Sequence, residues 1–184
     1  MKIISQKVIF SIKKFNINED VVSHDGNIQK TYWYVDKPNA VLVIVIHDNK
    51  IGLIKSERYL MGGVFSELLG GRIEANETSI EAAIREVKEE CGLNIAENNI
   101  AFLLSTYTLP SITNEKVDVY TANITELNTV NLQQEELVKD FAFFEKDEIL
   151  KLLENQEIMS CVDAYALTYY MLKENFKTNN SHHG

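Results

Sequence analysis

Three glutamates lie close together on one predicted helix, a spacing of carboxylates that suits the binding of a divalent cation. They are Glu86, Glu89 and Glu90. At about 100° per residue they share one face, where like charges repel and the C-terminal end of the helix dipole disfavours them. Mg²⁺ prefers carboxylate oxygens and leaves room for substrate phosphates, so a bound cation would remove this conflict. From the triplet alone, the alternative is a solvated acidic face.

The helix that must carry these glutamates is predicted by apolar periodicity and by signals at both ends. Apolar residues recur at spacings of three and four, at Ile80, Ile84, Val87 and Cys91. Thr78 and Glu81 have the spacing of a capping box, which predicts that the helix begins near Ser79. Gly92 stands where a left-handed C-terminal cap is expected.

The longer stretch from Gly71 to Leu93 resembles the Nudix box, the signature of the Nudix hydrolases. The pattern is Gly, five residues, Glu, seven residues, then Arg-Glu-apolar-any-Glu-Glu-any-Gly-apolar. Its fixed positions are filled by Gly71, Glu77, Arg85, Glu86, Val87, Glu89, Glu90, Gly92 and Leu93. The resemblance implies the Nudix α/β/α sandwich with a mixed sheet. It also implies attack of water on a phosphorus of a nucleoside diphosphate that is joined to another group.

The same resemblance implies a metal site and a structural role for the arginine of the box. Mg²⁺, with Mn²⁺ as a substitute, is expected on the side chains of Glu86, Glu89 and Glu90 and on the backbone carbonyl of Gly70. We group Arg85 with the catalytic residues because in the family this arginine pairs with the box glutamates and orients them. A salt bridge from Arg85 to Glu77 is also expected.

The general base is predicted to be Glu115, in the loop that follows the box. In ADP-ribose pyrophosphatases a glutamate from this loop takes the role, and a loop carboxylate can reach and deprotonate a water. The alternative for Glu115 is an exposed loop side chain. Glu89 is the second candidate, because its equivalent is the base in other Nudix subfamilies.

Two segments outside the box resemble ADP-ribose pyrophosphatases. Arg58 and Glu67 are separated as in that subfamily, and Pro110 lies about where it carries a proline after the box. We place Arg58 and Glu67 among the substrate-binding residues, because a guanidinium can form bidentate hydrogen bonds with phosphate oxygens. For Arg58 the alternative is a surface salt bridge. Leu69 departs from the pattern, since the subfamily usually has proline there.

Residues 1–38 are rich in β-forming side chains and predict an antiparallel β appendage in front of a Nudix domain at 39–178, with a disordered tail at 179–184. The only tryptophan, Trp33, falls in this appendage. In the resembled enzymes an aromatic residue of the appendage stacks on adenine, often across a dimer. We therefore expect Trp33 to contact the base and the protein to be a homodimer with swapped N-terminal sheets. The alternative is that Trp33 covers the core of its own sheet.

Charge and hydropathy exclude several classes of partner. The net charge of −9 makes a broad contact with nucleic acid or an anionic membrane unfavourable. The longest apolar run, 40–46, is too short to span a bilayer, and no signal peptide is recognised. We expect a cytoplasmic protein in which Cys91 and Cys161 are buried free thiols. A further helix is expected at 161–176, with an apolar face formed by Val162, Tyr165, Ala166, Tyr169 and Leu172.

The function predicted from the sequence is Mg²⁺-dependent hydrolysis of the pyrophosphate bond of ADP-ribose or a related nucleoside diphosphate sugar. The products would be a nucleoside monophosphate and a sugar phosphate. A second interpretation keeps the chemistry but changes the substrate to a GDP-sugar or a dinucleotide. A third, from another class, is a nucleotide sensor that does not hydrolyse its ligand. Metal-dependent turnover separates the third interpretation from the first two.

Overall fold

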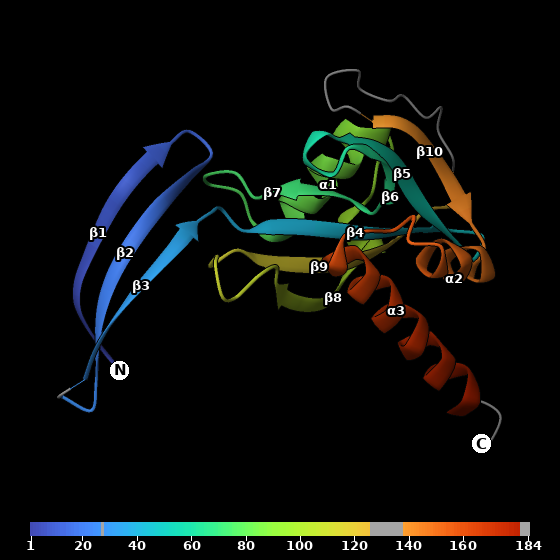
Figure 1. Cartoon of the computed structure of the whole chain (residues 1–184). Helices are drawn as coiled ribbons and strands as arrows, with labels where there is room; N and C mark the ends of the chain where they lie inside the picture. The colour runs from blue at the N-terminus through green and yellow to red at the C-terminus, as the bar shows by residue number, and fades with distance from the viewer. Residues whose placement is uncertain (27, 126–137, 181–184) are drawn as a thin grey trace.

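The computed structural model describes residues 1–26, 28–125 and 138–180 (Figure 1). Its strands form two separate sheets, one of three strands and one of seven. The helices are α1 (Ser79–Cys91), α2 (Lys146–Glu154) and α3 (Cys161–Asn180), with short 3₁₀ turns at Tyr59–Met61 and Glu97–Asn99.

The N-terminal sheet is an antiparallel meander of β1 (Lys2–Ile12), β2 (Phe15–His24) and β3 (Ile28–Asp36). Asp25 and Gly26 both have positive φ, 51° and 81°, as expected for residues of a tight turn. This sheet stands to one side of the rest of the molecule (Figure 1), and every residue of β1 is exposed. The predicted N-terminal antiparallel β element is therefore present, but it has almost no core within one chain.

The seven-stranded sheet has the order β10-β5-β4-β9-β8, with β6 paired to β5 and β7 paired to β4. The strand bounds are β4 Ala40–His47, β5 Lys50–Arg58, β6 Gly63–Glu67, β7 Leu69–Arg72, β8 Ile100–Tyr107, β9 Lys116–Asn123 and β10 Val138–Phe144. Strands β4 and β9 are parallel, and the other pairs are antiparallel. The sheet is thus mixed, as predicted, and β4 is its buried centre.

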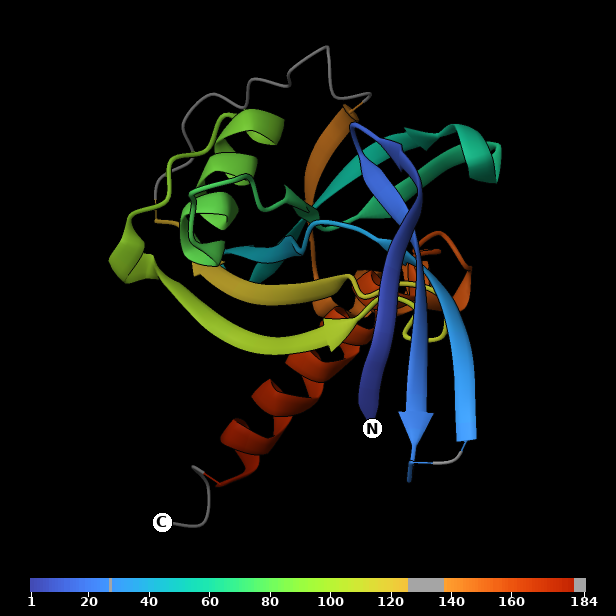
Figure 2. The same cartoon turned by 90° about the vertical axis from the view of Figure 1, so that its left-hand side faces the viewer.

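Helices cover both faces of this sheet and give the predicted α/β/α sandwich. Helix α1 packs on one face over a core that includes Val41, Val43 and Val87, whereas α2 and α3 pack on the other over Ile44, Leu53 and Leu167. Figure 2, which faces the N-terminal sheet, shows α1 and α3 on opposite sides of β8 and β9.

The ends of α1 follow from its local sequence. Thr78 accepts a hydrogen bond from the backbone N–H of Glu81, and the Glu81 side chain accepts one from the backbone N–H of Thr78, which completes the predicted capping box. Gly92 has φ 76° and ends the helix in the left-handed conformation. These caps fix the position of the last two turns, which carry the three glutamates.

Two predictions for α3 are wrong. Its buried side consists of Val162, Asp163, Ala166, Leu167, Tyr170 and Met171. Tyr165, Tyr169 and Leu172, predicted on the buried face, are exposed, because the helix is apolar on more than one side and packs through the neighbouring stripe. Cys161, predicted to be buried, is also exposed, whereas Cys91 is buried. Of the tail predicted at 179–184, residues 181–184 lie outside the described part of the chain.

Within the described residues, no helix has both the length and the apolar character needed to cross a membrane.

Candidate active site

One large cleft, of about 1160 Å³, opens beside the C-terminal turns of α1. Its walls come from elements far apart in the sequence. They are the β1–β2 turn, the link between β3 and β4, the start of β4, the end of β5, β7 with the residues after it, α1, Glu115 and Ser160. Glu86, Glu89, Glu90 and Gly70, the four predicted metal ligands, all line this cleft.

The acidic wall of the cleft is formed by two buried glutamates and one that is more open. Glu86 and Glu90 are only 7% and 4% exposed, while the Glu89 side chain is 40% exposed. Glu90 Oε2 accepts a hydrogen bond of 2.8 Å from the backbone N–H of Gly70. A Cβ on Gly71 would lie 2.4 Å from the Glu86 carboxyl carbon, so only glycine leaves room for this side chain.

Arg85 ties the glutamates of the box together. Its Nη1 donates to Glu86 Oε1 and to Glu89 Oε2, both at 2.8 Å, and its Nη2 donates to Glu77 Oε1 at 2.7 Å. The predicted salt bridge to Glu77 is therefore present. The hydrogen bond to Glu77 is the main cause that raises the pKa of Arg85, and the same bond lowers the pKa of Glu77. Arg72 contributes its carbonyl, which accepts from Nη2 at 2.9 Å.

The donor set has the chemistry of a hard-cation site, since two buried carboxylates and an adjacent backbone segment meet at a cleft. Among the described residues, however, no three His, Cys, Asp or Glu side chains form a cluster ready to hold a metal ion. The guanidinium of Arg85 bonds both Glu86 and Glu89. A cation on Glu86 would compete with Arg85 for the same carboxylate.

Arg58 and Glu67, both predicted to bind substrate, bind each other. Arg58 Nε donates to Glu67 Oε1 and Oε2 at 2.8 and 3.0 Å, and Nη2 also contacts Oε2. This bond raises the pKa of Arg58. The Arg58 side chain is 52% exposed and lines the cleft, whereas Glu67 is buried. Arg58 is thus the member of the pair that reaches the cleft, and Glu67 holds it.

Asp163 is a buried carboxyl that the sequence analysis did not single out. It lies in the first turn of α3, is 5% exposed, and its Oδ1 accepts a 2.7 Å hydrogen bond from the backbone N–H of Leu68. Burial raises its pKa to about 6. Leu68 joins β6 to β7, so Asp163 fixes the bend that leads from Glu67 to Gly70.

Glu115, the predicted base, lines the same cleft as the box glutamates. It is 7% exposed, so the alternative of an exposed loop side chain is wrong. Its Oε1 lies 2.7 Å from Lys37 Nζ, and its Oε2 accepts from Thr108 Oγ1 at 3.0 Å. The carboxylate is therefore held at the cleft by one cation and one hydroxyl.

Trp33 lies outside this cleft in its own chain. It is 61% exposed, so it does not cover the core of its own sheet, and its Nε1 donates to Glu19 Oε2 at 2.8 Å. It lines a separate pocket of about 430 Å³ together with Tyr32, Tyr34, Tyr107 and the loop residues 110–114.

Four cations of the cleft were not identified from the sequence. They are Lys13, Lys14, Lys37 and Arg72. Arg72 directly follows Gly71, the first residue of the box, so its position beside the site could have been predicted from the sequence. The three lysines belong to the β1–β2 turn and to the link between β3 and β4, and only the arrangement of the two sheets brings them to the cleft.

Comparison with known proteins agrees with this geometry. The family model for the NUDIX domain matches residues 36–163. An ADP-ribose pyrophosphatase of Bacillus subtilis (strain 168) is 32% identical over 180 residues, 94% of each chain. A methanol dehydrogenase activator of Bacillus methanolicus is 27% identical over 96% of this chain and 95% of its own. The fold is similar to a crystal structure of an ADP compounds hydrolase, with a TM-score of 0.79 and 21% identity over 97% of this chain and 96% of the other.

The family model covers more than half of the chain, and it includes the cleft residues of α1, β7 and the 108–115 loop. The Bacillus subtilis relative matches at nearly full length, from the N-terminal sheet to α3. The protein therefore belongs to the Nudix hydrolase family and is a pyrophosphatase.

Proposed function

We infer that the protein hydrolyses the diphosphate linkage of ADP-ribose or a related nucleoside diphosphate sugar. The observation that carries this proposal is the cleft, in which buried carboxylates of α1 face a set of cations from other elements. A diphosphate needs both, because its charge must be neutralised while water attacks one phosphorus. The similarity to relatives named ADP-ribose pyrophosphatase supports the choice of substrate.

The proposed metal ligands are Glu86, Glu90 and the carbonyl of Gly70, with Glu89 as a further ligand. Mg²⁺, or Mn²⁺ in its place, would polarise the phosphate and lower the pKa of a bound water. The protein supplies the orientation: Gly70 N–H holds Glu90, and the absence of a side chain at Gly71 leaves room for Glu86.

The proposed roles of the remaining residues follow from their positions. Arg58 contacts the phosphates from its fixed pair with Glu67. Glu115 accepts the proton of the attacking water, and Glu89 is the second candidate for this base. Each oxygen of Glu115 has one partner, which leaves further acceptor capacity on the carboxylate.

We assign a dimer and a base contact to the N-terminal region, residues 1–38. Large apolar side chains are exposed along β1, among them Ile3, Val8 and Phe10. A three-stranded sheet with such surfaces requires cover, and a second copy of the chain supplies it. Trp33 does not line the cleft of its own chain, so the proposal places it against the base held by the second copy. Trp33→Ala would then raise KM, and light scattering would give the mass of a dimer.

The test of the function is phosphate release through a coupled phosphatase, with and without Mg²⁺. ADP-ribose would be compared with GDP-mannose, UDP-glucose, NADH and a dinucleoside polyphosphate, and Glu90→Gln would serve as the inactive variant. We expect ADP-ribose to have the highest kcat/KM. If another nucleotide is preferred, the substrate assignment is wrong although the chemistry stands. Absence of turnover with every metal would favour the nucleotide sensor.

A further inference from the structure

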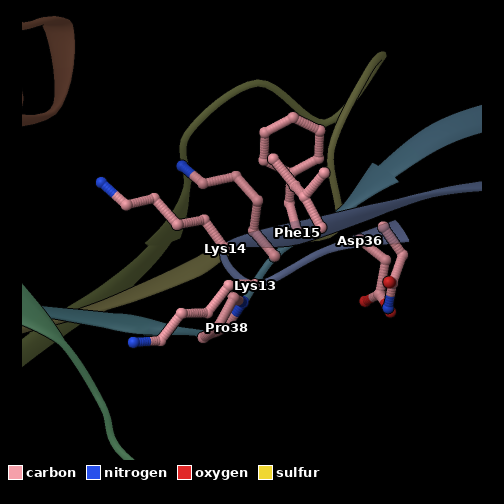
Figure 3. Close-up of a pocket in the computed structure, with 8 residues that line it drawn as sticks. Lys13, Lys14, Phe15, Asp36 and Pro38 are labelled. Carbon is pink, nitrogen blue, oxygen red and sulfur yellow. The ribbon is translucent and has the colours of Figure 1, made fainter. Parts of the chain in front are cut away.

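Two adjacent lysines, Lys13 and Lys14, form the turn between β1 and β2 and line the catalytic cleft. Figure 3, a close-up of a smaller pocket that the same turn also lines, shows the two lysine side chains extending to the side away from the Asp36 carboxylate. The residues that follow β7, including Glu74 and Ala75, line the same cleft. The lysines therefore reach the site from the N-terminal sheet rather than from the Nudix core.

Lys13 and Lys14 differ from most cations of the cleft because those other cations are paired with glutamates. Lys37 pairs with Glu115, Arg58 with Glu67, and Arg85 with Glu77, Glu86 and Glu89. Among the described residues that line the cleft, only Lys13, Lys14 and Arg72 are cations for which the structure gives no acidic partner. Their charges remain available to an anion in the cleft.

The backbone conformation of the β1–β2 turn gives no reason for lysine at both of its positions. Ile12 pairs with Phe15, so Lys13 and Lys14 are a two-residue hairpin loop. Two-residue hairpin loops favour residues with positive φ. Neither lysine has a positive φ, and two adjacent like charges repel.

Hydrogen bonds hold this turn at the cleft. Asn16 pairs with Asp36 in the ladder between β2 and β3, and Asp36 Oδ1 accepts from Asn114 Nδ2 at 2.6 Å. The backbone N–H of Lys37 donates to Asn114 Oδ1 at 3.1 Å, and that of Val35 donates to the Ile112 carbonyl at 2.8 Å. The strand that positions the turn is thus bonded to the same loop that carries Glu115.

The charge balance of the cleft differs from that of the whole protein. The cleft is lined by six lysines and arginines and by five acidic residues, all of them glutamates. The whole chain has 18 lysines and arginines and 27 aspartates and glutamates. Most of the glutamates belong to α1, and the lysines without an acidic partner belong to the β1–β2 turn. A ligand that carries charge on two neighbouring phosphates fits this arrangement.

We propose that Lys13 and Lys14 bind the phosphate of the nucleoside diphosphate that lies farther from Glu86 and Glu90. This assignment rests on the proposed function and adds the residues that fix the position of the diphosphate. Because the contact is made to a phosphate that is not attacked, it stabilises substrate and transition state equally. The lysines therefore set KM and leave kcat unchanged.

The test compares two double variants that change the charge equally. Lys13→Gln/Lys14→Gln removes the cations of the turn, and Lys151→Gln/Lys173→Gln removes two exposed lysines of α2 and α3. With the preferred substrate, we expect the turn variant to raise KM about tenfold, since one phosphate contact of about 1.4 kcal/mol corresponds to that factor. The salt dependence of KM should also weaken. The control variant should stay within about twofold of wild type, because its charges lie outside the cleft.

A conservative variant and a melting curve separate binding from misfolding. Lys13→Arg/Lys14→Arg keeps both charges and should restore the wild-type KM. All variants should keep the wild-type melting temperature. An unchanged KM in the glutamine turn variant, or an equal rise in the control, would overturn the assignment.

A binding measurement tests the lysines independently of the proposed hydrolytic activity. Calorimetric titration with ADP and Mg²⁺ measures binding of a nucleoside diphosphate without any turnover. If wild type hydrolyses no diphosphate sugar, the proposed function fails. ADP affinity still tests the lysines: a loss confined to the turn variant supports the contact, and equal affinity in both variants refutes it.

Discussion

Gly71 lies against the carboxylate of Glu86, so closely that a methyl group on its Cα would come within 2.4 Å of the Glu86 carboxyl carbon and Oε1. The glycine is therefore a steric requirement for the position of a proposed metal ligand. Glu86 is also a bonding partner of Arg85, so a shift of its side chain would disturb the whole acidic wall.

Gly71→Ala should reduce kcat by about 10²-fold, since misplacement of a catalytic group by roughly 1 Å has effects of that size. Steady-state kinetics with the preferred substrate gives the value. Gly63→Ala is the matched control, because its Cβ would meet only the ring of Phe65, at 3.1 Å, outside the cleft. Similar activity of the two variants would show that Glu86 tolerates displacement.

Removal of divalent metal should abolish turnover and leave the protein folded. Without a cation, Arg85 bonds Glu86 and Glu89, and Gly70 N–H bonds Glu90, so the carboxylates keep partners. Circular dichroism after chelation should match the untreated protein. Added Mg²⁺ should raise the melting temperature. At a hundredfold excess over its Kd, the cation should stabilise the folded state by up to about 2.7 kcal/mol. Glu90→Gln should lose that increase. A chelated protein that unfolds would contradict this prediction.

The pair of Glu77 and Arg85 should contribute to stability above about pH 4.5 and lose its effect at lower pH. The folded state lowers the pKa of Glu77 below its ordinary value of 4.5, chiefly through the Arg85 hydrogen bond. Stability is therefore lost as pH falls through the folded pKa. Urea unfolding of wild type and Glu77→Gln should show a gap at pH 7 that closes toward pH 3. A gap independent of pH would exclude ionisation as its cause.

Asp163 should have the opposite pH dependence. Burial raises its pKa from 3.8 to about 6, so in that window the unfolded chain ionises this carboxyl while the folded chain retains the proton. Wild type should therefore lose stability relative to Asp163→Asn as pH rises from 4 to 7. The loss should be up to about 3 kcal/mol, measured by urea unfolding at several pH values.

Asp147→Asn is the control for Asp163, because Asp147 is an exposed carboxyl in the first turn of α2. The difference in the free energy of unfolding between wild type and Asp147→Asn should not change in the same way over this pH range. If Asp163→Asn and wild type keep a constant difference from pH 4 to 7, the carboxyl is not protonated in the folded protein. The hydrogen bond to Leu68 N–H would then be made by the carboxylate.

The parts of the structure that the sequence predicted are those governed by local rules. The start of α1 follows from Thr78 and Glu81, its end from Gly92, and the turn of the N-terminal sheet from Asp25 and Gly26. The box also placed the glutamates on one wall, because they lie within two turns of a single capped helix.

What the sequence did not predict depends on packing between distant segments. Val162 and Tyr165 are equally apolar, and only contact with the sheet decides that the first is buried and the second exposed. Lys13 reaches the cleft through pairings in two strand ladders and a bond to Asn114, none of which has a local signal. Trp33 was assigned to the base, but within one chain it faces a different pocket.

The bonds that join β3 to the 108–115 loop have a thermodynamic consequence for ligand affinity. Asp36 and Lys37 are both bonded to Asn114, and Lys37 is also paired with Glu115. The backbone of the lysine turn is thereby ordered when the protein folds. Its conformational entropy is lost before any nucleotide arrives, so binding need restrict only the lysine side chains. Weakening the anchor at Asn114 would shift that ordering cost to the binding step and lower affinity without removing a single phosphate contact.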